Sequence, residues 1–112
     1  MATYASNIVI NSNEDFTQTF NLESSSNNSA LNLTGYSVSS QMRKYAGSST
    51  ATDFTATIVS PATSGKVSIS LTSGATSNLK EGRYVYDILI EKDSIKTKVV
   101  EGMVIVKKGV TR

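Results

Sequence analysis

The chain has 112 residues, a formal net charge of +2, and neither cysteine nor histidine. A chain of this length can bury one core but is too short for two, so we expect a single domain over residues 1–112. The missing residue types exclude disulfides, zinc–thiolate sites and histidine general bases, and a cysteine-free chain fits folding in a reducing cytoplasm.

The chain is rich in hydroxyl side chains, with 18 serines and 13 threonines, and 38% of its residues are apolar. Both side chains compete for the backbone hydrogen bonds of a helix, and threonine fits well on a pleated sheet. Apolar and polar residues also alternate with a period of two, which is the pattern of half-buried strands. Composition and period together favour an all-β fold.

Seven segments show this alternation, and turn-forming residues separate them. The first, residues 4–10, lies in an N-terminal strand or arm over residues 1–13. Short strands with frequent turns are typical of a two-sheet sandwich, with a closed barrel as the main competitor. We therefore expect an immunoglobulin-like β-sandwich of about seven antiparallel strands with an extended N-terminal arm. The other expected strands cover residues 15–22, 36–45, 53–59, 66–72, 83–91 and 96–107.

Two local features interrupt the strand pattern. Residues 73–82 begin with helix-capping residue types and end at Gly82, which predicts a short helical turn before the sixth strand. In the last strand Val99 and Val100 are adjacent apolar residues, and Gly102 follows them. This break in the alternation predicts a β-bulge over residues 100–102.

The start of the sixth strand, LKEGRYVY at residues 79–86, has the spacing of a tyrosine corner. In immunoglobulin sandwiches a tyrosine at this place bonds the backbone a few residues upstream, two positions before a cysteine. Tyr84 would be that tyrosine. Tyr86 would stand in the place of the cysteine, and its ring would fill the volume that a disulfide occupies. The alternative is that Tyr84 is an ordinary strand aromatic.

The acidic residues offer two weak routes to chemistry. The adjacent acids at residues 14 and 15 could join Asp53 or Asp87 around calcium, but such acids more often cap a helix or face solvent. Asp87 could act as a general acid. We expect instead that it faces solvent or pairs across strands with Lys98. We expect no Ser-x-x-Lys motif on a helix, and the glycines are scattered singly rather than grouped in a phosphate-binding motif. We expect no enzyme activity, no metal and no cofactor.

The charge is uneven, because residues 1–79 carry a net charge of −1 and residues 80–112 a net charge of +3. A basic region can mark a nucleic-acid surface. Acidic residues are interspersed among these lysines, however, and most tyrosines that would stack on bases fall on core-facing positions. We therefore expect a solvated strand face and no nucleic-acid partner. No apolar run is long enough for a membrane-spanning helix, so we expect no membrane partner.

Three stretches resemble a family of small structural proteins of tailed bacteriophages: ALNLTGYSVSSQMRK (30–44), GKVSISLTSGATSNLKEGRYVYDILI (65–90) and VVEGMVIVKKGVTR (99–112). Some members are domains similar to the N-terminal part of the baseplate upper proteins, which carry receptor-binding proteins. The matching motifs keep their order over about residues 15–112. The positions that the resemblance assigns to the fold include Gly35, Tyr36, Leu79, Gly82, Tyr84, Tyr86 and Gly102.

The resemblance implies a non-enzymatic structural protein of a phage virion, made in the host cytoplasm, whose partners are other virion proteins. It favours an adaptor in the tail or baseplate, with a capsid decoration protein as the first alternative. A carbohydrate-binding module, which would expose tyrosines along a groove, is an alternative from another class. An adaptor would dock through sheet faces, edges and its terminal segments. The candidate contacts are Tyr4, Ile8, Ile10, Lys107, Lys108 and Arg112.

Overall fold

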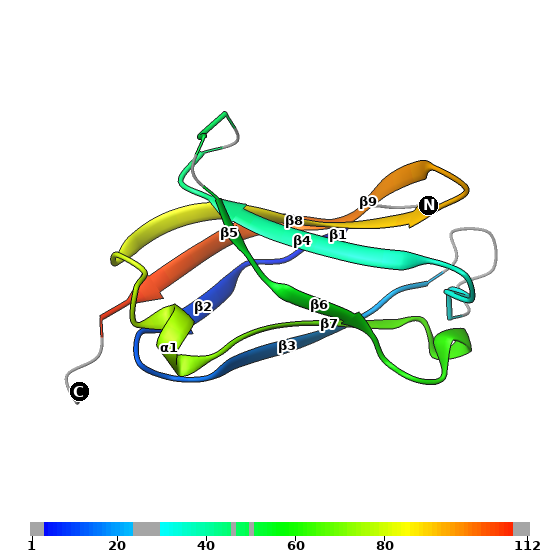
Figure 1. The fold of residues 1–112 in the computed structure, drawn as a ribbon, viewed down its shortest axis with the longest axis horizontal. Helices are drawn as coiled ribbons and strands as arrows, with labels where there is room; N and C mark the ends of the chain where they lie inside the picture. The colour runs from blue at the N-terminus through cyan, green and yellow to red at the C-terminus, as the bar shows by residue number, and fades with distance from the viewer. Residues whose placement is uncertain (1–3, 24–29, 46, 50, 109–112) are drawn as a thin grey trace.

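The computed structural model describes residues 4–23, 30–45, 47–49 and 51–108, and Tyr4 by its backbone alone. These residues form a mostly β protein in which two sheets face each other across one hydrophobic core, a sandwich arrangement (Figure 1). The described strands are β1 (Tyr4–Ala5), β2 (Ile8–Asn11), β3 (Phe16–Asn21), β4 (Ser37–Arg43), β5 (Ala51–Asp53), β6 (Thr55–Ile58), β7 (Lys66–Leu71), β8 (Gly82–Lys92) and β9 (Ile95–Lys107).

The larger sheet is mixed, and its order is β1–β9–β8–β4–β5 with β2 also beside β9. β1 and β2 run parallel to β9, with Ile8 opposite Val104. The pairs β9–β8, β8–β4 and β4–β5 are antiparallel. The prediction of antiparallel strands is therefore wrong for the N-terminal segment, because the first and last parts of the chain run in the same direction at one edge.

The smaller sheet has the order β3–β7–β6, and its pairs are antiparallel. The single strand expected over residues 53–59 is instead divided, since β5 pairs with β4 and β6 pairs with β7. Phe54 lies between β5 and β6. Its N–H donates to the Ser40 carbonyl at 3.0 Å and its side chain is only 5% exposed. The chain thus changes sheet at a buried ring without interrupting the alternation of side chains.

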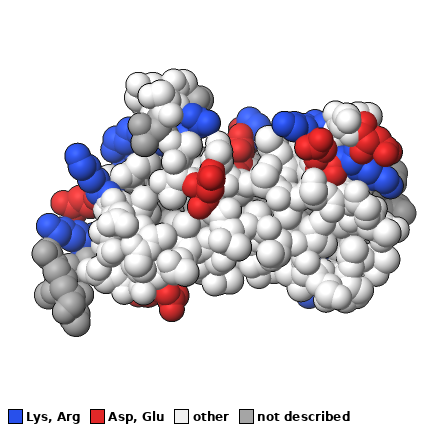
Figure 2. All heavy atoms as spheres, in the orientation of Figure 1, with Lys and Arg blue, Asp and Glu red and all other residues white. Residues whose placement is uncertain are grey.

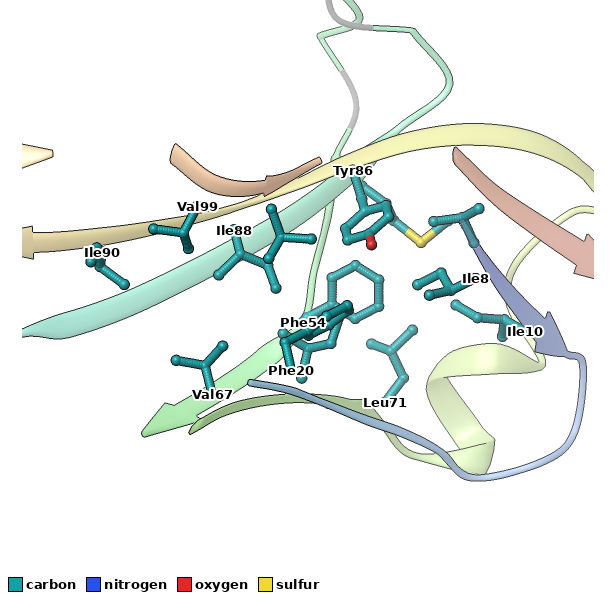
Figure 3. Close-up of a cluster of buried hydrophobic side chains, with 14 of the residues drawn as sticks. Ile8, Ile10, Phe20, Phe54, Val67, Leu71, Tyr86, Ile88, Ile90 and Val99 are labelled. Carbon is teal, nitrogen blue, oxygen red and sulfur yellow. The ribbon is translucent and has the colours of Figure 1, made fainter. Parts of the chain in front are cut away.

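The core between the sheets contains three aromatic rings (Figure 3). Tyr86 projects from β8, Phe20 from β3, and Phe54 from the link between β5 and β6. The ring of Tyr86 is centred 6.5 Å from that of Phe20 and 6.4 Å from that of Phe54, distances at which aromatic pairs attract each other. Aliphatic side chains complete the core, and those with no exposed surface are Ile10, Val67, Ile69, Ile88, Ile90, Val99, Val100 and Val104.

A β-bulge interrupts β9 one residue before the predicted range. Ile88 pairs with Val100 and Leu89 pairs with Lys98, so Val99 is the extra residue on β9. Val99 and Val100 are both fully buried. The bulge therefore lets two adjacent valines enter the core, which an unbroken strand would place on opposite faces.

The predicted helical turn is present as α1 (Ser73–Thr76). Its N-cap is Thr72, whose hydroxyl accepts a hydrogen bond of 3.2 Å from the Ala75 N–H. A short 3-10 helix, η1 (Ala62–Ser64), lies between β6 and β7. No helix in the described ranges is long and apolar enough to cross a membrane.

Candidate docking interface

The N-terminal segment is an edge strand of the larger sheet rather than a free arm. Ile8 and Ile10, two of the candidate contacts, are 5% and 0% exposed and lie in the core of the domain itself (Figure 3). Their side chains are therefore not available as a docking surface, which corrects the interface expected from the sequence. The backbone of Tyr4, a third candidate, pairs with Val100 of β9.

The backbone of Ser6 holds this edge strand where β1 ends and β2 begins. Its carbonyl accepts a hydrogen bond of 2.6 Å from the Tyr86 hydroxyl, and its N–H donates to the Glu101 carbonyl at 2.9 Å. A Cβ atom at Gly102 would lie 2.0 Å from that Ser6 carbonyl oxygen, so the close approach favours glycine there. Burial raises the pKa of the Tyr86 phenol above its ordinary value. The hydroxyl is therefore protonated, and able to donate, at neutral pH.

The outer edge of β2 offers backbone groups to a partner strand. The N–H groups of Ser6 and Ser12, at either end of this segment, both donate to carbonyls of β9. Because backbone direction alternates along a strand, the N–H and C=O groups of Val9 point away from β9. Within the described part of the chain, β9 is the one strand that pairs with β2. This edge is therefore open to pairing.

The C-terminal end of β9 adds positive charge near the same edge. Lys107 lies opposite Asn11 of β2, and both Lys107 and the following Lys108 are exposed. Arg112, the remaining C-terminal candidate, lies outside the described residues. The two lysines flank the end of β2, where they can attract an acidic partner segment.

Of the two alternatives for Tyr84, a tyrosine corner or an ordinary strand aromatic, the structure shows the backbone bond of the corner. The Tyr84 hydroxyl donates to the backbone carbonyl of Lys80 at 2.7 Å. Gly82 lies between them with a φ of +140°, a conformation that other residues rarely adopt. Leu79 packs against the core at the beginning of the turn. These residues shape the entry into β8, and none of them presents a reactive group.

The tyrosines differ widely in exposure. Tyr86 is 4% exposed, whereas Tyr45, which follows β4, is 63% exposed. Tyr36, directly after Gly35, and Tyr84 are half-buried, and a lysine ammonium lies 5.5 Å and 5.0 Å from their respective ring centres. A cation over a ring competes with a sugar for the same face. A carbohydrate-binding module would expose such rings, and of these four tyrosines Tyr45 alone is mostly exposed.

Two of the acidic residues considered for calcium have other partners. The Asp15 carboxylate accepts a hydrogen bond of 2.7 Å from the Ser73 N–H at the start of α1. The Asp53 carboxylate accepts one of 2.6 Å from the side chain of Gln41. Among the residues that the structure describes, no three histidine, cysteine, aspartate or glutamate side chains are grouped to hold a metal ion. Asp15 thus accepts a hydrogen bond at the start of α1, whose N-cap residue is Thr72.

Asp87 was expected to face solvent or to pair with Lys98, and the ion pair seen among the described residues joins Lys98 to Glu101 instead. The Lys98 ammonium lies 3.6 Å from the Glu101 carboxylate. The bulge places Leu89 opposite Lys98 and Asp87 opposite Glu101, so two carboxylates face each other across the strands. Asp87 is half-buried on the outer face of the larger sheet.

The outer face of the larger sheet is partly apolar. Val9 is 47% exposed, Met103 38% and Ile105 37%. Val9 pairs with Ile105, and Met103 lies two residues from Ile105 on β9, so the three form one surface. These three residues were not predicted from the sequence. The alternation of side chains could have identified them, because Val9 lies between the buried Ile8 and Ile10 and therefore points outward.

The outer face of the smaller sheet carries hydroxyl groups instead. Its central residues form two rows across β3, β7 and β6, and every member is serine or threonine. Charged side chains also lie mostly over the layer of the larger sheet in Figure 2. The rows are Thr17, Ser70, Thr55 and Thr19, Ser68, Thr57.

The comparisons with known proteins bear on the fold. No family model matches the chain, and no curated protein matches it. Among solved structures, the chain is similar to InlP of Listeria monocytogenes, with a TM-score of 0.52 and 14% sequence identity over 91% of this chain. The chain spans 26% of the length of that InlP structure. At this identity the likeness supports the β-sandwich fold alone.

Proposed function

We propose that this chain is an immunoglobulin-like domain of a tailed-phage virion and that it acts by docking rather than by catalysis. Strand order supports the immunoglobulin-like assignment, since β3–β7–β6 corresponds to strands B, E and D of that fold. Likewise, β5–β4–β8–β9 corresponds to strands C′, C, F and G. The bond from Tyr84 to the Lys80 carbonyl occurs at the start of strand F, where the fold has its tyrosine corner.

The phage assignment rests on the ordered motifs that resemble baseplate domains. Several of their residues have structural roles in the fold: Tyr84 in the corner, Tyr86 in the core and Gly102 under the Ser6 carbonyl. On this proposal the protein is an adaptor in the tail or baseplate. Its partners are other virion proteins, and its place is the assembled particle.

The observation that carries the docking proposal is the open edge of β2. An extended segment of a partner can pair with the N–H and C=O of Val9, so that backbone hydrogen bonds supply affinity and side chains set the register. Proteins usually cover or shorten such edges, because an open edge invites pairing with other chains. Lys107 and Lys108 beside this edge favour a partner segment that carries acidic residues.

The test is the copy number of this protein in purified particles of the phage whose genome carries its gene, measured by quantitative mass spectrometry. A number that matches the symmetry of the tail or baseplate is the expected result. Hundreds of copies would identify a capsid decoration protein instead. Absence of the protein from particles would contradict both assignments.

A further inference from the structure

The outer face of β9 changes in chemistry along the strand. Its side chains point outward at every second position, because Val104 and Val106 are buried. The Glu101 carboxylate lies 3.6 Å from the Lys98 ammonium, whereas Lys107 makes no ion pair with another described residue. Two exposed aliphatic side chains are thus followed by an exposed cation. The outward residues are, in order, Glu101, Met103, Ile105 and Lys107.

The register between β9 and β2 brings this order to the open edge. Val9 lies opposite Ile105, and Asn11 lies opposite Lys107. The Asn11 carbonyl accepts a hydrogen bond of 3.3 Å from the Glu14 N–H, so the chain turns away from the edge after Asn11. A strand added to this edge therefore has Val9 at its centre and Asn11 at its end.

The side chains of an added strand follow from this register. Residues opposite each other on neighbouring strands project from the same face of a sheet. The partner residue opposite Val9 therefore lies in one row with Val9 and Ile105, beside Met103. The partner residue opposite Asn11, two positions away, lies in the row of Lys107. An added strand is roughly 10 Å from β9, a gap that a lysine and a glutamate side chain together can span.

The other sheet edges offer different chemistry to an added strand. On the outer face of the smaller sheet, the edge strands present threonines, at Thr17 and Thr19 of β3 and at Thr55 and Thr57 of β6. At the far edge of the larger sheet, β5 is three residues long. The edge of β2 differs from these because an aliphatic surface and a cation lie directly beside its outward backbone groups.

We propose that the partner of this edge is an extended segment with an aliphatic residue and a glutamate two positions apart. The aliphatic side chain packs on Val9, Ile105 and Met103, and the glutamate pairs with Lys107. Backbone hydrogen bonds to Val9 fix the register, and this spacing selects the segment. An apolar centre with a charged rim is the usual anatomy of a protein–protein contact. The inference rests on the proposed docking at β2 and names the chemistry of its partner.

Blocked heptapeptides of threonine test this spacing. Two carry valine and glutamate at the third and fifth positions, one in each order, because the added strand can run parallel or antiparallel to β2. In the control peptide valine and glutamate are adjacent and therefore point to opposite faces. The better of the two spaced peptides should bind at least about tenfold more tightly than the control. Titration followed by the NMR signal of the Val9 amide measures the affinities and locates the site.

Protein variants identify the two contacts. Lys107→Gln and Ile105→Thr should each weaken binding of the spaced peptide severalfold. Lys66→Gln removes the same charge from the smaller sheet and should leave the affinity unchanged. Melting temperatures verify that the variants fold.

Three results would overturn the proposal. One is equal binding of spaced and control peptides, another is no shift of the Val9 signal at millimolar peptide, and the third is equal affinity of Lys107→Gln and the unmodified protein. Each would leave the phage assignment intact, because that assignment depends on the copy number in particles.

Discussion

The Tyr86 hydroxyl donates a hydrogen bond of 2.6 Å to the carbonyl of Ser6, 80 residues earlier in the chain. The bond joins β8, inside the larger sheet, to the edge strand on the far side of β9. Tyr86→Phe removes the donor and leaves that carbonyl without this bond, so the free energy of unfolding should fall by about 1 kcal/mol. Urea denaturation measures the change. Tyr45→Phe, at an exposed ring, is the control and should have no effect.

The same hydroxyl makes stability depend on alkaline pH. Burial raises the pKa of Tyr86 in the folded protein, while the unfolded chain keeps the ordinary value of about 10. Above that pH the unfolded state loses the proton first, so the contribution of this group is present below about pH 10 and is lost as pH rises. The stability advantage of the unmodified protein over Tyr86→Phe should therefore shrink above pH 10. A difference that stays constant through this range would contradict the assignment.

Gly102 should tolerate no side chain. In Gly102→Ala the new Cβ would lie 2.0 Å from the Ser6 carbonyl oxygen, so the edge strand must shift away from β9. Overpacking of this kind costs about 1–3 kcal/mol, and amide hydrogen exchange along β2 should accelerate. Gly74→Ala is the matched control, because its Cβ would meet Thr72 at an ordinary 3.9 Å. Equal stability of the two variants would refute the close approach.

The tyrosine corner makes its own contribution. Tyr84→Phe keeps the ring but removes the bond to the Lys80 carbonyl, and the free energy of unfolding should fall by up to about 1 kcal/mol. Tyr36→Phe is the comparison, since its half-buried hydroxyl bonds no other described residue. Thermal and urea unfolding of the two variants side by side measure the difference. If both are as stable as the unmodified chain, the corner bond has no energetic role.

The sequence predicted those features that depend on residues close together in the chain. Alternation located most strands, the spacing from residue 80 to Tyr84 located the corner, and the adjacent valines located the bulge to within one residue. The change of sheet at Phe54 could not be predicted, because alternation continues through it while the hydrogen-bond partners change.

The candidate interface was harder to predict than the fold. Alternation shows that Ile8 and Ile10 share a face, but it does not show whether that face meets the core or a partner. Only the parallel pairing with β9 decides this. Parallel and antiparallel strands have the same two-residue alternation, so the sequence pattern does not show the direction of pairing. The contact of Gly102 with Ser6 likewise joins residues almost a whole chain apart.

The most direct measurement of the docking account is the incorporation of a Val9→Pro variant into phage particles. Proline removes the outward N–H of Val9 but spares the bonds to β9, and edge strands tolerate proline. Val9→Thr is the matched control. We predict that the two variants have similar melting temperatures and that Val9→Pro alone is depleted from purified particles. Equal incorporation of both variants would contradict docking through the open edge of β2.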